Sequence, residues 1–158
     1  PGIVGVLGSK PARADPDVKP PVFFGLIADG VHVHPTMAVL LQRLAPEQTV
    51  LVSDALAPYG LADGEHRWDE RVLLVHNGTC RLEDGTLAGV TLPQLEGVKR
   101  LACWSKEIGP AIWSATIAPR QVIQTTCNIE EALLGQPLSD LLRWTQNSAG
   151  DLQWANAA

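Results

Sequence analysis

The sequence predicts an α/β fold built on parallel strands, and three observations lead to this prediction. Two short apolar segments, Val22–Ala28 and Thr49–Ser53, have the composition of buried strands. A stretch with helical periodicity joins them through short connections. Each apolar segment is followed at once by an acidic residue, Asp29 in the first case and Asp54 in the second. A strand, a helix and a strand in this order form a βαβ unit, which implies parallel strands and a right-handed crossover.

The joining helix is expected to begin at Pro35, because proline is tolerated in the first turn, and to end before Pro46. Apolar residues recur in it at intervals of three and four, which predicts one buried face. The residues of this face are Met37, Leu40, Leu41 and Leu44.

The middle of the chain changes to an antiparallel pattern. Arg71–His76 and Thr79–Glu83 flank Asn77-Gly78, and this dipeptide is a strong hairpin signal because both positions accept positive φ. We therefore expect an antiparallel hairpin, inserted after the second parallel strand at about residues 65–84.

Two helices and a final hairpin are expected after this insertion. Leu92–Ser105 carries an apolar stripe at helical spacing, and a further helix covers about Pro110–Ile123, where Pro119 should break or bend it. Leu141–Thr145 and Leu152–Trp154 then predict the hairpin strands, on either side of a turn.

Composition excludes several classes of partner. A net charge of -5, with scattered Lys and Arg, argues against nucleic acid, which needs a clustered basic surface. No apolar run approaches the roughly 20 residues of a membrane span, and no secretory signal is visible. The three cysteines form no CxxC pair, which favours reduced thiols and a cytoplasmic protein.

Asp54 is the sharpest candidate for chemistry, since it ends a buried strand. A carboxylate there could act as a general base and acid beside an activated water. It could equally be the N-cap of a following helical turn, because Asp is a favoured capping residue. The two interpretations have similar weight on strand geometry alone.

His32 and His34 are two residues apart, so an extended strand would direct both toward one face, as in many metal sites. However, His34 precedes Pro35 at a helix start, where the side chains can diverge. A substrate-binding or structural role is therefore at least as well supported.

Asp84–Gly89 follows the expected hairpin and precedes a helix. Its glycines would let backbone N–H groups approach a ligand. An ordinary tight turn is the equal alternative.

Several short pieces occur in order along nearly the whole chain, and the ordered set is more specific than any one of them. They are Pro1-Gly2, Ile27–Val33, Leu51–Ala55, Asp84–Gly89, Leu95–Val98 and Ser114–Arg120. Together they resemble the N-acetylglucosamine-6-phosphate deacetylases, a family of the amidohydrolase superfamily.

This resemblance implies the C-terminal part of a metal-dependent-hydrolase TIM-type (β/α)8 barrel. Val22–Ala28 and Thr49–Ser53 would be the last two barrel strands, and residues 1–135 would belong to the barrel. Residues 136–158 would supply strands of a small β-domain. The earlier part of the barrel would then lie in an N-terminal portion of the same protein that precedes this chain.

The resemblance also implies the reaction, which is hydrolysis of the acetamide of N-acetylglucosamine 6-phosphate to glucosamine 6-phosphate and acetate. Asp54 matches the catalytic aspartate and His32 a histidine that contacts the sugar phosphate. The other substrate-binding positions would be Asp29, Gly30, Val31, Leu87, Ala88 and Gly89. The family uses a divalent metal of the zinc or iron type, which polarises the carbonyl and activates the water.

The metal ligands of the family have no counterpart in this sequence, so we expect them outside the chain and expect the chain alone to be inactive. A homodimer of the full-length protein is also implied. Two alternatives stay open: another hydrolase of the amidohydrolase superfamily, and a non-catalytic remnant or binding module. The missing initiator Met favours the fragment interpretation, and Asp29–His32 with Thr86–Gly89 favours the sugar-phosphate branch.

Overall fold

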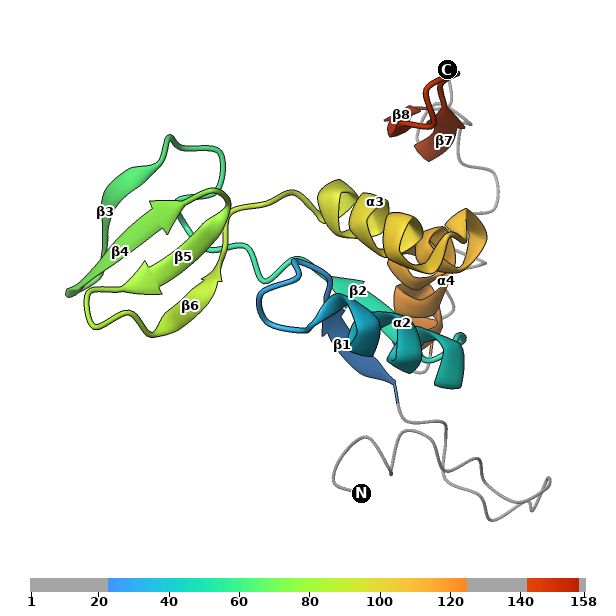
Figure 1. Cartoon of the computed structure of the whole chain (residues 1–158), viewed down its shortest axis with the longest axis horizontal. Coiled ribbons are helices and arrows are strands. Elements are labelled where there is room, and N and C mark those ends of the chain that lie inside the picture. The colour runs from blue at the N-terminus through green and yellow to red at the C-terminus, as the bar shows by residue number, and fades with distance from the viewer. Residues whose placement is uncertain (1–22, 125–141, 157–158) are drawn as a thin grey trace, which may run out of the picture.

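The predicted βαβ unit is present in the structure. This computed structural model describes residues 23–124 and 142–156, so the Pro1-Gly2 piece and residue 22 lie outside the described part. β1 (Phe24–Ile27) and β2 (Thr49–Val52) pair in parallel, with Leu26 opposite Leu51 (Figure 1). α2 (Pro35–Leu44) joins them, as the sequence predicts. The α/β fold class is therefore confirmed.

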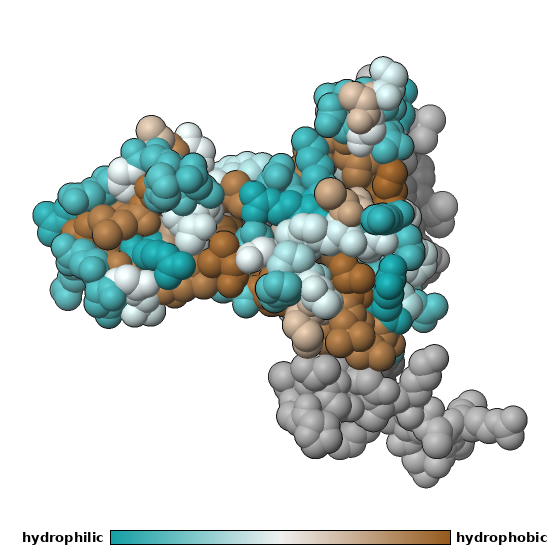
Figure 2. All heavy atoms as spheres, viewed as in Figure 1, coloured by the Kyte–Doolittle hydropathy of each residue, from teal (hydrophilic) through white to brown (hydrophobic). Residues whose placement is uncertain are grey.

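The buried face of α2 differs from the prediction. Ala38 and Gln42 are its buried residues, and Leu41 packs against the main core. The three other residues of the predicted apolar face are exposed: Met37, Leu40 and Leu44. A small residue such as Ala38 allows a close approach of the helix to its neighbours, so the larger side chains face outward. Figure 2 shows apolar surface over this part of the molecule.

The insertion is a four-stranded antiparallel sheet and not a hairpin alone. Its strands are β3 (Gly64–Trp68), β4 (Arg71–His76), β5 (Thr79–Leu82) and β6 (Leu87–Val90), hydrogen-bonded in this order. Figure 1 shows the sheet to one side of the β1–β2 unit. The turn between β4 and β5 is confirmed, since Asn77 and Gly78 have φ values of 49° and 78°.

The outer strands of this sheet were not predicted. β3 contains the sequence GEHRW and is largely exposed, so no apolar alternation marks it. β6 was expected to be a glycine loop or tight turn, and that expectation is wrong for Leu87–Gly89. These residues form an edge strand, because β5 provides the hydrogen-bonding partners.

Two helices follow the sheet. α3 (Gln94–Ser105) buries Val98 and Leu101 completely, close to the predicted stripe. α4 (Ile108–Gln124) packs against α3 and β2. Its buried residues follow helical spacing: Ala111, Ser114 and Ala118.

Pro119 was expected to break or bend the helix, and the break does not occur: α4 continues through this residue to Gln124. Proline removes one amide donor from a helix interior. Here that loss falls beside the fully buried Ala118, so the packing of this face outweighs one missing hydrogen bond.

The final hairpin is confirmed within the described residues. β7 (Leu142–Gln146) pairs antiparallel with β8 (Leu152–Asn156), and the rings of Trp144 and Trp154 lie 5.4 Å apart. Leu152 is buried in the core that α3 also lines. No described helix combines the length and the apolar character that crossing a membrane requires.

Candidate functional site

The carboxyl end of β1 leads into a turn that the Asp29 side chain organises. Asp29 Oδ1 accepts hydrogen bonds from the N–H groups of Val31, at 3.0 Å, and His32, at 2.9 Å. Asp29 Oδ2 lies 2.7 Å from His32 Nδ1. Gly30 adopts a φ of 77°, which suits glycine at this tight position. The turn therefore fixes both the backbone and the ring of His32.

The pKa of Asp29 is lower than its ordinary value. Burial is the largest influence and on its own favours the neutral acid, but the hydrogen bond with His32 opposes it. The N–H groups of Val31 and His32 add to that opposition, and together these bonds lower the pKa. An ionised carboxylate only accepts hydrogen bonds, so His32 Nδ1 carries the proton that it shares with Asp29.

The other ring nitrogen of His32 faces the end of β2. His32 Nε2 lies 3.6 Å from Asp54 Oδ2. The Asp54 side chain is 40% exposed, whereas that of Asp29 is 5% exposed. The two predicted site residues on neighbouring strands are thus brought together, with Asp54 open to solvent.

The helix-cap interpretation of Asp54 is wrong. Asp54 adopts a φ of 55°, and the next segment forms an isolated bridge and turns instead of a helix. Its backbone carbonyl accepts a hydrogen bond from the N–H of Val90, at 3.1 Å. The carboxylate is therefore free of a capping role.

The two histidines make different contacts. His34 is the N-cap of α2, and its Nδ1 accepts a hydrogen bond from the N–H of Thr36 at 3.2 Å. This contact of His34 is local to the start of α2, as expected for a structural histidine. Within residues 23–124 and 142–156, no group of three or more His, Cys, Asp or Glu could hold a metal ion.

The end of the edge strand β6 lies beside Asp54. The Leu56 N–H donates a hydrogen bond of 2.9 Å to the Val90 carbonyl oxygen, and the Val90 N–H donates one of 3.1 Å to the Asp54 carbonyl oxygen. A Cβ atom at Gly89 would lie 3.0 Å from the Asp54 carbonyl oxygen and 2.8 Å from Leu56 Cγ. Glycine is therefore required here. Ala88 instead packs into the core of the four-stranded sheet.

Residues on α3 hold both strand ends, and sequence reasoning missed them. Arg100 Nη1 donates a hydrogen bond of 2.5 Å to the Asp29 carbonyl oxygen. Gln94 Nε2 donates one of 2.7 Å to the Leu51 carbonyl oxygen. The Trp104 ring borders Gly30, where a Cβ atom would lie 3.3 Å from it. Nothing in a helical surface sequence distinguishes such residues from solvated ones.

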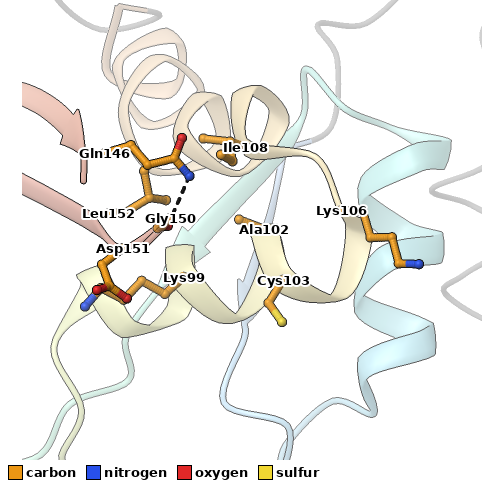
Figure 3. Close-up of a pocket in the computed structure, with 9 residues that line it drawn as sticks. All are labelled: Lys99, Ala102, Cys103, Lys106, Ile108, Gln146, Gly150, Asp151 and Leu152. Atoms are coloured by element: carbon orange, nitrogen blue, oxygen red, sulfur yellow. Dashed lines mark hydrogen bonds between the residues drawn. The ribbon is translucent and has the colours of Figure 1, made fainter. Parts of the chain in front are cut away.

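The larger hollows of the described structure lie elsewhere. The space between the strand ends and the start of α3 is only about 10 Å³, lined in part by Asp29 and Ser53. A hollow of about 430 Å³ lies between α3 and the terminal hairpin. In Figure 3, Gln146 bonds Gly150 beside this hollow, and the Lys106 side chain points away from the hairpin. The described residues therefore present an open strand end and not an enclosed pocket.

The relatives found by comparison with known proteins are named as deacetylases of amino-sugar phosphates. No family model matches the chain. The chain is 31% identical over 137 residues to N-acetylglucosamine-6-phosphate deacetylase of Mus musculus, covering 84% of this chain and 27% of that protein. It is 38% identical over 92 residues to N-acetylgalactosamine-6-phosphate deacetylase of Escherichia coli O157:H7, covering 58% of this chain and 22% of that protein.

The fold agrees with these relatives. The crystal structure of N-acetylglucosamine-6-phosphate deacetylase from Thermotoga maritima matches with a TM-score of 0.61 and 32% identity. That match covers 66% of this chain and 30% of the other. The chain thus spans roughly a quarter of the length of the first relative. Sequence and fold together confirm the resemblance drawn from the motifs: the chain is related to a portion of the N-acetylglucosamine-6-phosphate deacetylases.

Proposed function

We propose that this chain supplies part of the active site of an N-acetylglucosamine-6-phosphate deacetylase. The reaction is hydrolysis of the acetamide to glucosamine 6-phosphate and acetate. The observation that carries the proposal is the 3.6 Å approach of His32 Nε2 to Asp54 Oδ2 at the ends of two parallel strands. Active sites of α/β barrels lie at the carboxyl ends of their strands.

In this proposal, β1 and β2 are the last two strands of a TIM-type barrel. Their parallel register and the crossover through α2 support this assignment. The four-stranded sheet is an insertion between β2 and α3, and residues 136–158 contribute to a small β-domain, of which residues 142–156 are described.

Asp54 is the proposed general base and acid. Its carboxylate is 40% exposed and lacks a capping role, so it can take a proton from an attacking water. The water oxygen bonds to the acetamide carbon, and the C–N bond then breaks. The proton held by Asp54 passes to the departing amine nitrogen, so the carboxylate is regenerated.

His32 is the proposed contact to the sugar phosphate. Its Nδ1–H is committed to Asp29, so only Nε2 is available outward. When Nε2 also carries a proton, it can donate to a phosphate oxygen while Nδ1 keeps its hydrogen bond to Asp29.

The remaining predicted residues have different roles in the proposal. Asp29 is nearly buried and bonds its own turn, so we assign it to positioning His32 and not to direct contact. Val31 is 45% exposed beside it and can line the substrate site together with Gly30. Gly89 brings β6 against Asp54, which supports a lining role for Leu87–Gly89.

The resemblance also implies a divalent metal of the zinc or iron type. Asp29, His32 and Asp54 meet at the strand ends, but no group of three or more His, Cys, Asp or Glu among the described residues could hold a metal ion. These residues do not fit a complete metal site, and the roles proposed for Asp54 and His32 do not require them to bind the metal. The homodimer that the resemblance implies belongs to this proposal and rests on the resemblance alone.

A second substrate is favoured by a specific relative. The Escherichia coli O157:H7 protein named N-acetylgalactosamine-6-phosphate deacetylase is 38% identical over the matched residues. The two sugars differ only in the configuration of the hydroxyl group at C4. We therefore include N-acetylgalactosamine 6-phosphate as the alternative substrate.

Acetate release by the whole protein, measured with both amino-sugar phosphates, tests the proposal. We expect turnover with a phosphorylated substrate and far weaker turnover with unphosphorylated N-acetylglucosamine. The 158-residue chain assayed alone should release no acetate. Absence of turnover by the whole protein with either phosphate would refute the proposed activity.

A further inference from the structure

We propose that α3 is a two-point clamp that sets the separation of His32 and Asp54, with Arg100 and Gln94 as its positioning residues. The catalytic consequence rests on the proposed function, whereas the clamp itself is a property of the fold.

The first point of the clamp holds the end of β1. Arg100 donates to the backbone carbonyl of Asp29, the residue whose side chain builds the His32 turn. Arg100 is itself oriented by Glu96, since its Nε lies 3.2 Å from Glu96 Oε1 one helical turn earlier. A guanidinium held on one side by a carboxylate loses little further freedom when it binds the carbonyl.

The second point holds the end of β2. Gln94, in the first turn of α3, donates to the carbonyl oxygen of Leu51. Leu51 lies in β2, and Asp54 follows it three residues later, just after the strand ends. Any displacement of the β2 end therefore carries Asp54 with it.

The helix between the two points is packed into the main core. Gln94 and Arg100 are six residues apart, or about 9 Å along an α-helix. Val98 and Leu101 are fully buried between and beside them. Gly97 on this face lies against Ala28, which directly follows β1. A fixed helical spacing thus becomes a fixed spacing between two strand ends.

The two points should have separable effects. Loss of the Arg100 bond loosens the turn that presents His32, which weakens substrate binding. Loss of the Gln94 bond loosens the segment that presents Asp54, which slows the chemical step. A change that affects only substrate binding raises KM, and one that affects only the transition state lowers kcat.

We suggest Arg100→Met, Gln94→Met and the matched control Lys99→Met in the whole protein. Lys99 is on the same helix and lines the hollow beside the terminal hairpin, away from the strand ends. Arg100→Met should raise KM about tenfold and Gln94→Met should lower kcat about tenfold, as for other supporting residues. Lys99→Met should change neither, and Arg100→Lys should restore most of the affinity.

Hydrogen exchange provides a readout that does not depend on activity. The amides of Val31 and His32 donate to Asp29 Oδ1, so their exchange should accelerate in Arg100→Met. The Val90 amide donates to the Asp54 carbonyl oxygen and should accelerate in Gln94→Met. If the wild-type protein releases no acetate, the proposed function fails while these rates still test the clamp.

Exchange rates equal to those of Lys99→Met would overturn the clamp. Equal changes of kcat and KM in both variants would also overturn it, because they indicate a general loss of structure. Should Arg100→Met fail to fold, Gln94→Met still decides the question. The clamp then requires faster exchange of the Val90 amide without faster exchange of the Val31 and His32 amides.

Discussion

One imidazole, that of His32, lies between two carboxylates of different character: its Nε2 is 3.6 Å from Asp54 Oδ2, and its Nδ1 is 2.7 Å from Asp29 Oδ2. Asp29 is buried and fully used by its own turn. Asp54 is partly exposed and available. This asymmetry separates a carboxylate that orients the ring from one that can react.

Replacement of Asp54 by Asn should lower kcat by about 100-fold or more, because the amide cannot exchange the proton. The fold should be retained, since the side chain bears no capping contact. Acetate release and circular dichroism check these two outcomes. Glu47→Gln is the matched control, because it removes a carboxylate that precedes β2, whereas Asp54 follows this strand. Near-normal turnover of Asp54→Asn would remove Asp54 from the mechanism.

Asp29 should make stability depend on pH in the acid range. Its pKa is lower in the folded protein than the ordinary value of 3.8, so the ionised form stabilises the fold above that pH. This contribution is lost as the pH falls below 3.8 and through the folded pKa. Urea unfolding of the wild type should therefore lose stability more steeply on acidification than that of Asp29→Asn. Parallel pH profiles would contradict the assignment.

Gly89→Ala should destabilise the protein by about 1–3 kcal/mol, the usual cost of overpacking. The added Cβ would lie 2.8 Å from Leu56 Cγ and 3.0 Å from the Asp54 carbonyl oxygen. Gly109→Ala is the control, since nothing lies within 4 Å of a Cβ atom at that helical position. The midpoints of urea unfolding compare the two. An unchanged midpoint for Gly89→Ala would show that β6 can withdraw from Asp54 without cost.

The two described cysteines should differ strongly in reactivity. Cys80 is fully buried in the four-stranded sheet, and burial raises the pKa of its thiol. Cys103 is exposed on α3. In a Cys127→Ser background, a thiol reagent at mildly alkaline pH should label Cys103 at once and Cys80 only after denaturation. Equal labelling rates in the native protein would mean that the sheet opens readily.

Local patterns predicted the elements that carry their own signals. The two parallel strands, α2 and the Asn77-Gly78 turn follow from run length, proline position and turn chemistry, and all are present. The placement of Asp54 and His32 on neighbouring strand ends follows from the same βαβ pattern.

Elements that depend on distant partners were not predictable in this way. β3 is charged and exposed and exists because β4 pairs with it. The buried face of α2 is set by what lies against it, so periodicity identified the apolar stripe but not its direction. The contact of Arg100 with Asp29 joins residues 71 positions apart, which no local pattern encodes.

The bridge between Ala55 and Val90 means that the chain leaves β2 and returns toward α3 at almost the same point. Insertions whose two ends lie together are well tolerated, because their length and content can change without moving the scaffold. Evolution could therefore enlarge, trim or exchange the intervening four-stranded sheet while β2 and α3 stay in place. The same junction is a natural graft point for protein engineering.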